Sequence, residues 1–255
     1  MSGMPSRERS SGPEPARALV VVPTYNERET LPGLVKAVLA LEGGWRLLIV
    51  DDNSPDGTGP LADQMAAAEP RLSVLHRPGK QGLGPAYLAG FREALNRPEV
   101  EFVAQMDADF SHHPTDLPRL LAATADADLA IGSRYVPGGR TQGWGFRRRL
   151  LSRLGNLYVR MVLGVPVRDL TAGFRCWRRR ALEAVELQAV RTRGYGFQIE
   201  MACRTIAAGY RVVEVPICFT ERRAGQSKMS GSIVAEALVL PDVDDVVRAV
   251  RRVTQ

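Results

Sequence analysis

Two aspartates, Asp107 and Asp109, stand one residue apart directly after the apolar run 102–106. A short apolar run that ends in turn residues predicts a buried strand. Carboxylates just past such a strand lie where α/β sheets bind ligands, and their oxygens suit Mg²⁺ or Mn²⁺. A D-x-D tripeptide also occurs in solvated loops and at helix starts, so the pair by itself does not decide between these roles.

Acidic and polar residues also follow two earlier predicted strands. Glu27 comes shortly after the strand 18–22, and Asp52 is the second residue after the strand 45–50. Carboxyl ends of parallel strands share one edge of a sheet, and carboxylates there can accept hydrogen bonds from ribose hydroxyls or ring N–H groups. Turn and helix-cap roles are the alternative for part of these segments. No G-x-x-x-x-G-K-[ST] is present, and no G-x-G-x-x-G follows the first strand, which argues against a P-loop enzyme or a dinucleotide oxidoreductase.

Basic side chains in separate downstream segments suit the phosphates of a nucleotide. Arg134 lies in the segment 132–135, and Arg222 and Lys228 lie in the segment 222–228. If a nucleoside diphosphate binds, its charge must be neutralised, and a cation held by Asp107 and Asp109 together with these side chains would do so. A single arginine more often lies on the solvated surface, so the prediction depends on the three basic residues together.

The elements that position these residues alternate between strand and helix patterns. This order is typical of βαβ units, and it predicts an α/β protein with a mixed, mostly parallel sheet flanked by helices. We expect strands at 18–22, 45–50, 72–75, 101–106, 129–132, 212–215 and 217–220, with Pro216 indicating an edge or a bulge, and helices at 30–41, 61–68, 82–95, 114–123, 147–163 and 232–253.

The predicted helix 147–163 is basic and amphipathic. Its wheel places apolar side chains on one face and stacks arginines beside them. Packing of the apolar face on the sheet is one interpretation, and binding at a membrane interface is the other. The apolar residues are Leu150, Leu154, Leu157, Tyr158 and Met161, and the arginines are Arg149, Arg153 and Arg160.

Composition and charge narrow the class of protein. The 255-residue chain carries a net charge of +6, but the segment 134–180 alone carries +11, so the remainder sums to −5. This concentration predicts a local anionic partner, such as phosphate groups, a nucleic acid or a membrane surface. Three scattered cysteines indicate a reducing, cytosolic compartment, and no apolar run reaches the ~20 residues that a bilayer span requires.

Eight segments together resemble family 2 glycosyltransferases of the GT-A fold, and among them the polyprenol-phosphate (dolichol-phosphate) mannose synthases. The resemblance covers about residues 17–235, and it implies inverting transfer of mannose from GDP-mannose to a polyprenyl phosphate with a divalent cation. The segments are VVPTYNERETLPGLV, VDDNSPDGT, GKQGLGPAYLAGF, MDADFSHHP, GSRYVPGG, DLTAGFRCW, GYGFQIEM and RRAGQSKMS.

The resemblance also implies site residues. Asp109 is the implied metal ligand with Asp107 close by, and Asp109 and Arg134 are the residues we expect to be catalytic. The family often has Gln where this chain has Ser111, so ligation by Ser111 is in question and water can take that position. We expect Arg134, Arg147 and Arg222 to hold the acceptor phosphate. The implied donor-binding residues are Pro23, Tyr25, Glu27, Asp52, Asp107, Ala108, Asp109, Arg134, Arg222 and Lys228.

The expected organisation is a disordered leader (1–17), one GT-A catalytic domain (18–235) and a C-terminal helical tail (236–255). A lipid acceptor requires a peripheral position on the cytoplasmic face of a membrane, with a membrane subunit as a further partner to consider. Three rivals remain. They are a same-fold enzyme using UDP-glucose or another sugar nucleotide on undecaprenyl phosphate, an inactive scaffold, and a basic nucleic-acid-binding module. The low aromatic content of 6% and the acidic motifs argue against binding of nucleic acid.

Overall fold

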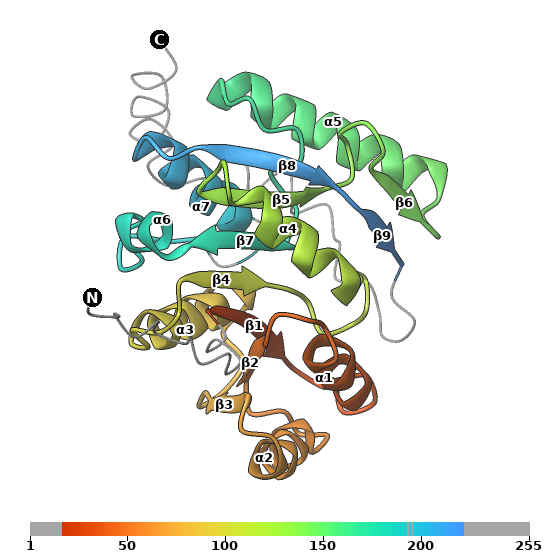
Figure 1. The fold of residues 1–255 in the computed structure, drawn as a ribbon. Helices are drawn as coiled ribbons and strands as arrows, with labels where there is room; N and C mark the ends of the chain where they lie inside the picture. Colours follow the sequence, from red (N-terminus) through yellow and green to blue (C-terminus); the bar gives the residue numbers. More distant parts are fainter. Residues whose placement is uncertain (1–16, 193, 195, 222–255) are drawn as a thin grey trace, which may run out of the picture.

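The computed structural model describes residues 17–192, 194 and 196–221, and its centre is a seven-stranded sheet (Figure 1). All strands of this sheet run parallel to their neighbours except β7, which is antiparallel to both of its neighbours. In sheet order the strands are β3 (Leu72–His76), β2 (Arg46–Asp51), β1 (Ala18–Thr24), β4 (Phe102–Gln105), β7 (Arg175–Arg178), β5 (Leu129–Ser133) and β8 (Val212–Pro216).

Helices cover both faces of this sheet. The helices are α1 (Leu31–Leu39), α2 (Thr58–Ala68), α3 (Leu83–Leu95), α4 (Leu117–Ala123) after a 3₁₀ turn (Pro114–Asp116), α5 (Phe146–Leu163), α6 (Arg179–Ala184) and α7 (Gly196–Ala207). A small second sheet pairs β6 (Arg140–Gln142) with β9 (Cys218–Thr220).

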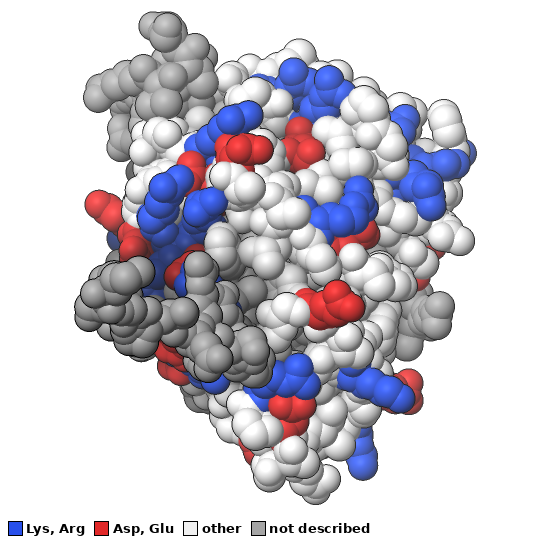
Figure 2. Space-filling model, in the orientation of Figure 1, with Lys and Arg blue, Asp and Glu red and all other residues white. Residues whose placement is uncertain are grey.

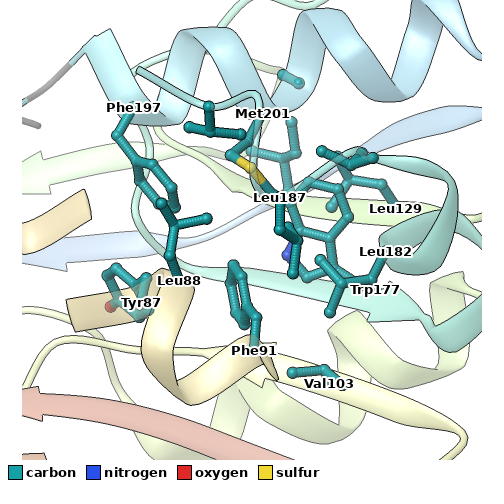
Figure 3. Packing of buried hydrophobic residues seen from close by; sticks show 14 of the residues in the cluster. Tyr87, Leu88, Phe91, Val103, Leu129, Trp177, Leu182, Leu187, Phe197 and Met201 are labelled. Atoms are coloured by element: carbon teal, nitrogen blue, oxygen red, sulfur yellow. The ribbon is translucent and has the colours of Figure 1, made fainter. Parts of the chain in front are cut away.

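The central strands are buried on both faces, which explains their nearly continuous apolar sequences. In β1, Leu19 and Val21 belong to one hydrophobic cluster, and Val20 and Val22 belong to the other. The first cluster includes residues of α3, α5, α6 and α7, and the second includes residues of α1, α2 and α4. Figure 3 shows the aromatic centre of the first cluster, where the Tyr87 and Phe197 rings stack with centroids 5.9 Å apart.

The expected α/β class and all of the predicted strands within the described residues are confirmed, with ends that differ by a few residues. Pro216 ends the edge strand β8, as its position predicted. The short elements β6, β7, α6 and α7 were missed, because arginines interrupt the patterns of the first three and α7 follows a glycine-rich segment. The predicted leader up to residue 16 and the predicted final helix lie outside the described residues.

Helix α5 does not pack its predicted apolar face on the sheet, so that interpretation is wrong. Its buried residues are Asn156, Val159 and Leu163, which lie on another side of the helix. The predicted face is exposed, with side chains at 45% (Leu150), 52% (Leu154), 47% (Leu157), 41% (Tyr158) and 65% (Met161) relative exposure. Among the described residues, none of the helices has the length and hydropathy of a bilayer-spanning segment.

The contact between α3 and the sheet generates a prediction about stability. A Cβ on Gly90 would lie 2.3 Å from Cγ1 of Val21 and 3.0 Å from Cγ2 of Val50. We expect Gly90→Ala to lower the free energy of unfolding by about 1–3 kcal/mol in urea denaturation, because the branched valines cannot turn away. The matched control is Gly155→Ala in α5, where the added methyl meets open space and should raise stability by up to about 1 kcal/mol. Shifts of the same sign in both variants would contradict this account of the close contact.

Candidate active site

The carboxyl ends of β1, β2 and β4 meet at one edge of the sheet, and each is followed by a strained turn. Asn26 (φ 62°), Asn53 (φ 56°) and Phe110 (φ 58°) are the non-glycine residues with positive φ in the described part of the chain. They follow β1, β2 and β4 respectively. Left-handed backbone in non-glycine residues is costly and gathers at functional sites. The strained backbone therefore lies at the same edge of the sheet at which the sequence predicted the acidic site residues.

The loops after β1 and β2 are joined by hydrogen bonds. The backbone N–H of Glu27 donates to Thr58 Oγ1 at 3.0 Å, and that of Asn26 donates to Ser54 Oγ at 3.2 Å. The Glu27 carboxylate accepts a hydrogen bond from Thr30 Oγ1 at 3.0 Å. These contacts hold the segment of Pro23, Tyr25 and Glu27 beside the segment of Asp52. Tyr25 is half-buried, with Lys80 Nζ lying 4.1 Å from its ring centroid.

Asp52 is buried and forms an ion pair with Arg77, a residue that the sequence analysis did not select. Burial raises the pKa of the Asp52 carboxyl, and the Arg77 guanidinium opposes that shift. Arg77 also donates to Gln81 Oε1 at 3.0 Å. The position expected to contact the nucleotide therefore presents an acceptor and a cationic donor side by side.

Asp107 is held by side chains from a neighbouring helix and from its own loop. Tyr87 of α3 donates its hydroxyl to Asp107 Oδ1 at 3.2 Å. Burial raises the pKa of Tyr87 well above its usual value, and the Asp107 charge adds to the shift, so the phenol stays protonated and remains a donor. The backbone N–H of Asp107 donates to His112 Nδ1 at 3.4 Å, and the His112 ring stacks on Phe174.

Asp109 and Ser111 form a compact group of oxygens. The Asp109 side chain is buried, and its Oδ1 accepts a hydrogen bond from the backbone N–H of Ser111 at 2.9 Å. The Ser111 hydroxyl is also buried, and it has no hydrogen-bond partner among the described residues. An unpartnered buried hydroxyl beside a carboxylate fits an oxygen-ligand cation site, which Mg²⁺ completes with substrate phosphates and water. No group of three His, Cys, Asp or Glu side chains in the described residues forms a closed metal cage.

Arg134 is buried and paired. Its backbone N–H and Nε both donate to Asp169 Oδ2 at 2.8 Å, and its terminal nitrogen donates to Asp169 Oδ1 at 2.6 Å and to Thr171 Oγ1 at 2.8 Å. Asp169 itself is fully buried. The guanidinium also lies 5.4 Å from the ring of Trp144. The structure thus fixes Arg134 rigidly, and its part in holding an anion stays a prediction.

The other predicted basic residues are placed differently. Arg147 is exposed in the first turn of α5. Its neighbour Arg148, which was not predicted, lies over Trp144 at 4.2 Å and pairs with Glu221 at 2.7 Å. Arg222 and Lys228 lie outside the described residues.

Several arginines of the basic segment are structural. Arg178 donates to backbone carbonyls at the end of α4, and Arg179 does so at the end of α3. Arg175 is fully buried and donates to the carbonyls of Leu170 and Ala172. The sequence predicted that the arginines of residues 134–180 form a surface for an anionic partner. Part of them instead bind backbone carbonyls at helix ends and in loops.

Four residues of the site were not predicted from the sequence: Arg77, Tyr87, His112 and Asp169. Tyr87 and His112 stand inside the recognised segments GKQGLGPAYLAGF and MDADFSHHP, which is a signal that was available. Asp169 is the single acid among the arginines of residues 134–180, and an isolated acid in such a run is a natural candidate for a buried partner.

The buried pair of Arg134 and Asp169 gives a test of stability. We expect Asp169→Asn to lower the free energy of unfolding by about 3–5 kcal/mol in urea denaturation, because it leaves the Arg134 charge buried without its counter-ion. The control is Glu101→Gln, which breaks the exposed pair with Arg17 and should cost less than about 1 kcal/mol. Equal losses in the two variants would show that Arg134 does not depend on Asp169.

Comparison with known proteins identifies the family of the chain. The model of glycosyl transferase family 2 matches residues 19–186. The chain is 52% identical over 246 residues to the polyprenol monophosphomannose synthase of Mycolicibacterium smegmatis, covering 93% of this chain and 92% of that protein. It is 51% identical over 223 residues to the undecaprenyl-phosphate mannosyltransferase of Micrococcus luteus, covering 88% of this chain and 91% of that protein.

A solved structure is similar in fold. It is glucosyl-3-phosphoglycerate synthase from Mycobacterium tuberculosis in complex with Mn²⁺, UDP-glucose and phosphoglyceric acid, with a TM-score of 0.65 and 20% identity over 88% of this chain and 77% of that chain. This likeness confirms the expected GT-A architecture. With the family model and the two sequence relatives, it leads to one assignment: the chain belongs to glycosyl transferase family 2.

Proposed function

We propose that this protein transfers mannose from GDP-mannose to the phosphate of a polyprenol, with inversion at the anomeric carbon. One observation carries the proposal. The oxygens of Asp109 and Ser111 lie at the same edge of the sheet as the loops that contain Asp52 and Glu27. The chain that carries this arrangement is about half identical to two relatives, one named polyprenol monophosphomannose synthase and the other undecaprenyl-phosphate mannosyltransferase. GDP-mannose as the donor goes beyond those names and belongs to the proposal.

The chemistry places its main demand on the leaving group. An oxygen of the lipid phosphate attacks the anomeric carbon, the bond from that carbon to the GDP oxygen breaks, and both electrons of that bond leave with GDP. The second pKa of a phosphate monoester is ~6, so the attacking oxygen is already anionic near neutral pH and needs no general base. The environment of His112 agrees with a reaction that needs no general base. Its ring is buried between Phe174 and Phe219, and burial lowers its pKa, which makes the imidazole a weaker base.

Asp107, Asp109 and Ser111 are the residues that would hold a divalent cation. When bound there, Mg²⁺ or Mn²⁺ supplies positive charge that offsets the charge developing on the leaving diphosphate. The residues themselves perform the positioning. The backbone of Ser111 orients the Asp109 carboxylate, and Tyr87 holds Asp107.

The remaining predicted residues have distinct proposed tasks. Asp52, paired with Arg77, faces the nucleotide together with Pro23, Tyr25 and Glu27, and Ala108 leaves room between the two carboxylates for the donor. Arg134, Arg147 and Arg222 hold the acceptor phosphate, and Arg222 and Lys228 also bind the donor diphosphate. Fixed donors of this kind stabilise a developing charge without reorganising during the reaction.

Helix α5 is the proposed docking surface for the membrane that carries the acceptor. Its exposed apolar face is flanked by the exposed arginines Arg147, Arg149 and Arg153. Figure 2 shows blue basic side chains interspersed with uncharged ones over α5. An apolar stripe beside basic residues suits the interface of an anionic leaflet, where each Lys or Arg contributes roughly 1 kcal/mol. The proposed location is therefore the cytoplasmic surface of a membrane, with or without a membrane subunit.

Incubation with radiolabelled GDP-mannose, Mg²⁺ or Mn²⁺ and polyprenyl phosphate tests the reaction. We expect label in the lipid extract as a mild-acid-labile product, and we expect Asp109→Ala to reduce its formation at least about 100-fold by removing a cation ligand. Calorimetric titration with Mn²⁺ should show weakened binding in the same variant. The control Asp63→Asn alters an exposed carboxylate on α2 and should leave both measurements unchanged. Label transfer from UDP-glucose in place of GDP-mannose would support the rival donor, and near-normal turnover of Asp109→Ala would refute the metal assignment.

Flotation with liposomes containing anionic lipid tests the docking surface. At low salt we expect the protein to float, and we expect the double variant Arg149→Glu, Arg153→Glu to lower the bound fraction at least about tenfold, since it replaces attraction by repulsion. The matched control Lys36→Glu, Arg119→Glu makes the same change of charge on α1 and α4, which cover the opposite face of the sheet from α5. If both double variants lose the same fraction of liposome binding, the net charge of the protein and not the α5 surface controls binding. If the wild-type protein does not float, the remaining explanation is that a membrane subunit recruits it.

A further inference from the structure

A chain of buried hydrogen bonds fixes the orientation of the Gln198 side chain. The indole N–H of Trp177 can only donate, and it donates to Gln105 Oε1 at 3.3 Å. Gln105 must therefore present its amide nitrogen on the other side, where it donates to Gly173 O at 3.0 Å and to Gln198 Oε1 at 2.9 Å. Gln198 then uses its oxygen as the acceptor, so its amide nitrogen points the other way.

That nitrogen is buried and has no hydrogen-bond partner in the described part of the chain. Gln198 as a whole is 2% exposed. A buried amide N–H₂ that remains unsatisfied costs free energy, so such a group in a folded protein calls for a partner. The partner is expected on the side of Gln198 that faces the site edge.

Gly173 marks the place where a partner would fit. A Cβ added to Gly173 would lie 3.6 Å from Gln198 Nε2, 3.7 Å from Asp107 Oδ2 and 3.7 Å from His112 Cε1. The donor amide and the Asp107 carboxylate therefore approach one point beside a glycine backbone. With glycine at residue 173 no side-chain atom lies at that point, and the methyl of an alanine would fit there at van der Waals distances.

The chemistry of these two groups selects what can bind there. A cation is disfavoured by the N–H₂ group, and a phosphate oxygen is disfavoured by the Asp107 carboxylate. A neutral hydroxyl satisfies both, because it accepts a hydrogen bond from one group and donates one to the other. Asp107 lies two residues from the Asp109 metal ligand, so the hydroxyl belongs to a group carried next to the diphosphate.

We propose that Gln198 and Gly173 form a subsite for one hydroxyl of the transferred sugar, which accepts from Gln198 Nε2 and donates to Asp107 Oδ2. The proposal rests on the proposed function, since it takes the sugar of the donor nucleotide as the ligand. It makes Gln198 a residue that recognises the sugar, separate from the groups that recognise the nucleotide and the diphosphate.

Two variants test the subsite by isothermal titration with GDP and with GDP-mannose in the presence of Mg²⁺. Gln198→Met keeps the length of the side chain but removes the amide, and Gly173→Ala leaves Gln198 untouched and adds a methyl between Gln198 Nε2 and Asp107 Oδ2, where it crowds the hydroxyl. The contacts of that methyl are ordinary van der Waals distances, so the fold should tolerate it. For both variants we expect affinity for GDP-mannose to fall about 10- to 100-fold, because one loses the amide and the other crowds the hydroxyl from the Gly173 side, while affinity for GDP stays within about twofold.

Monodeoxy analogues of GDP-mannose identify the hydroxyl. The analogue that lacks it should bind the wild-type protein weakly and should lose little further affinity in Gln198→Met, because the same contact is already absent. Gln64→Met, an exposed residue of α2, and Gly155→Ala are the matched controls, and neither should change affinity for the sugar nucleotide.

The outcomes separate this inference from the proposed function. If wild-type protein does not bind GDP-mannose but binds another sugar nucleotide, the proposed donor is wrong, and the same variants tested with that nucleotide decide the subsite. If GDP-mannose binds and both folded variants keep wild-type affinity for it, the subsite is refuted. Loss of GDP and GDP-mannose affinity together would show a structural role for Gln198 and would also overturn the inference.

Discussion

The pairing of β7 with β4 on one side and β5 on the other is the contact on which the site depends. Because β7 runs antiparallel to β4, its first residue lies opposite the last residue of β4, with Arg175 facing Gln105. The residues just before β7 therefore arrive at the same edge as the residues just after β4. Asp169 thereby meets Arg134, and Gly173 lies beside Asp107. One reversed strand thus brings two distant parts of the chain to the same edge of the sheet.

The site edge combines buried charges that are paired with neutral groups that orient them. Asp52 has Arg77, and Arg134 has Asp169, so neither pair leaves an isolated charge in the interior. Tyr87 and the Ser111 backbone hold the carboxylates of the D-x-D tripeptide. Preorganisation of this kind suits a reaction whose barrier lies mostly in charge on a leaving group. The strained turns after β1, β2 and β4 are the conformational cost of bringing these groups together.

The arginines of the second half divide into two populations with different physics. Arg178 and Arg179 donate to backbone carbonyls at the ends of α4 and α3, and Arg175 donates to carbonyls of the loop before β7. Several of those on α5 remain at the surface beside an exposed apolar face, where charge acts on a partner. The sum of charges along the segment could not distinguish these populations, because both consist of arginines at similar spacing. Whether each arginine is buried against backbone carbonyls or exposed to solvent decides to which population it belongs.

Hydrophobic periodicity and the position of acids after strands are local properties, so the sequence predicted the α/β class, the parallel strands and the carboxylates that follow them. It did not determine β7, the partners Arg77, Tyr87 and Asp169, or the orientation of Gln198. Asp169 lies 35 residues from Arg134, and Gln198 lies 93 residues from Gln105. Contacts over such separations exist only once the strand order is set. The exposed face of α5 was also decided by tertiary structure, since a helical wheel shows which residues share a face but not which face the sheet covers.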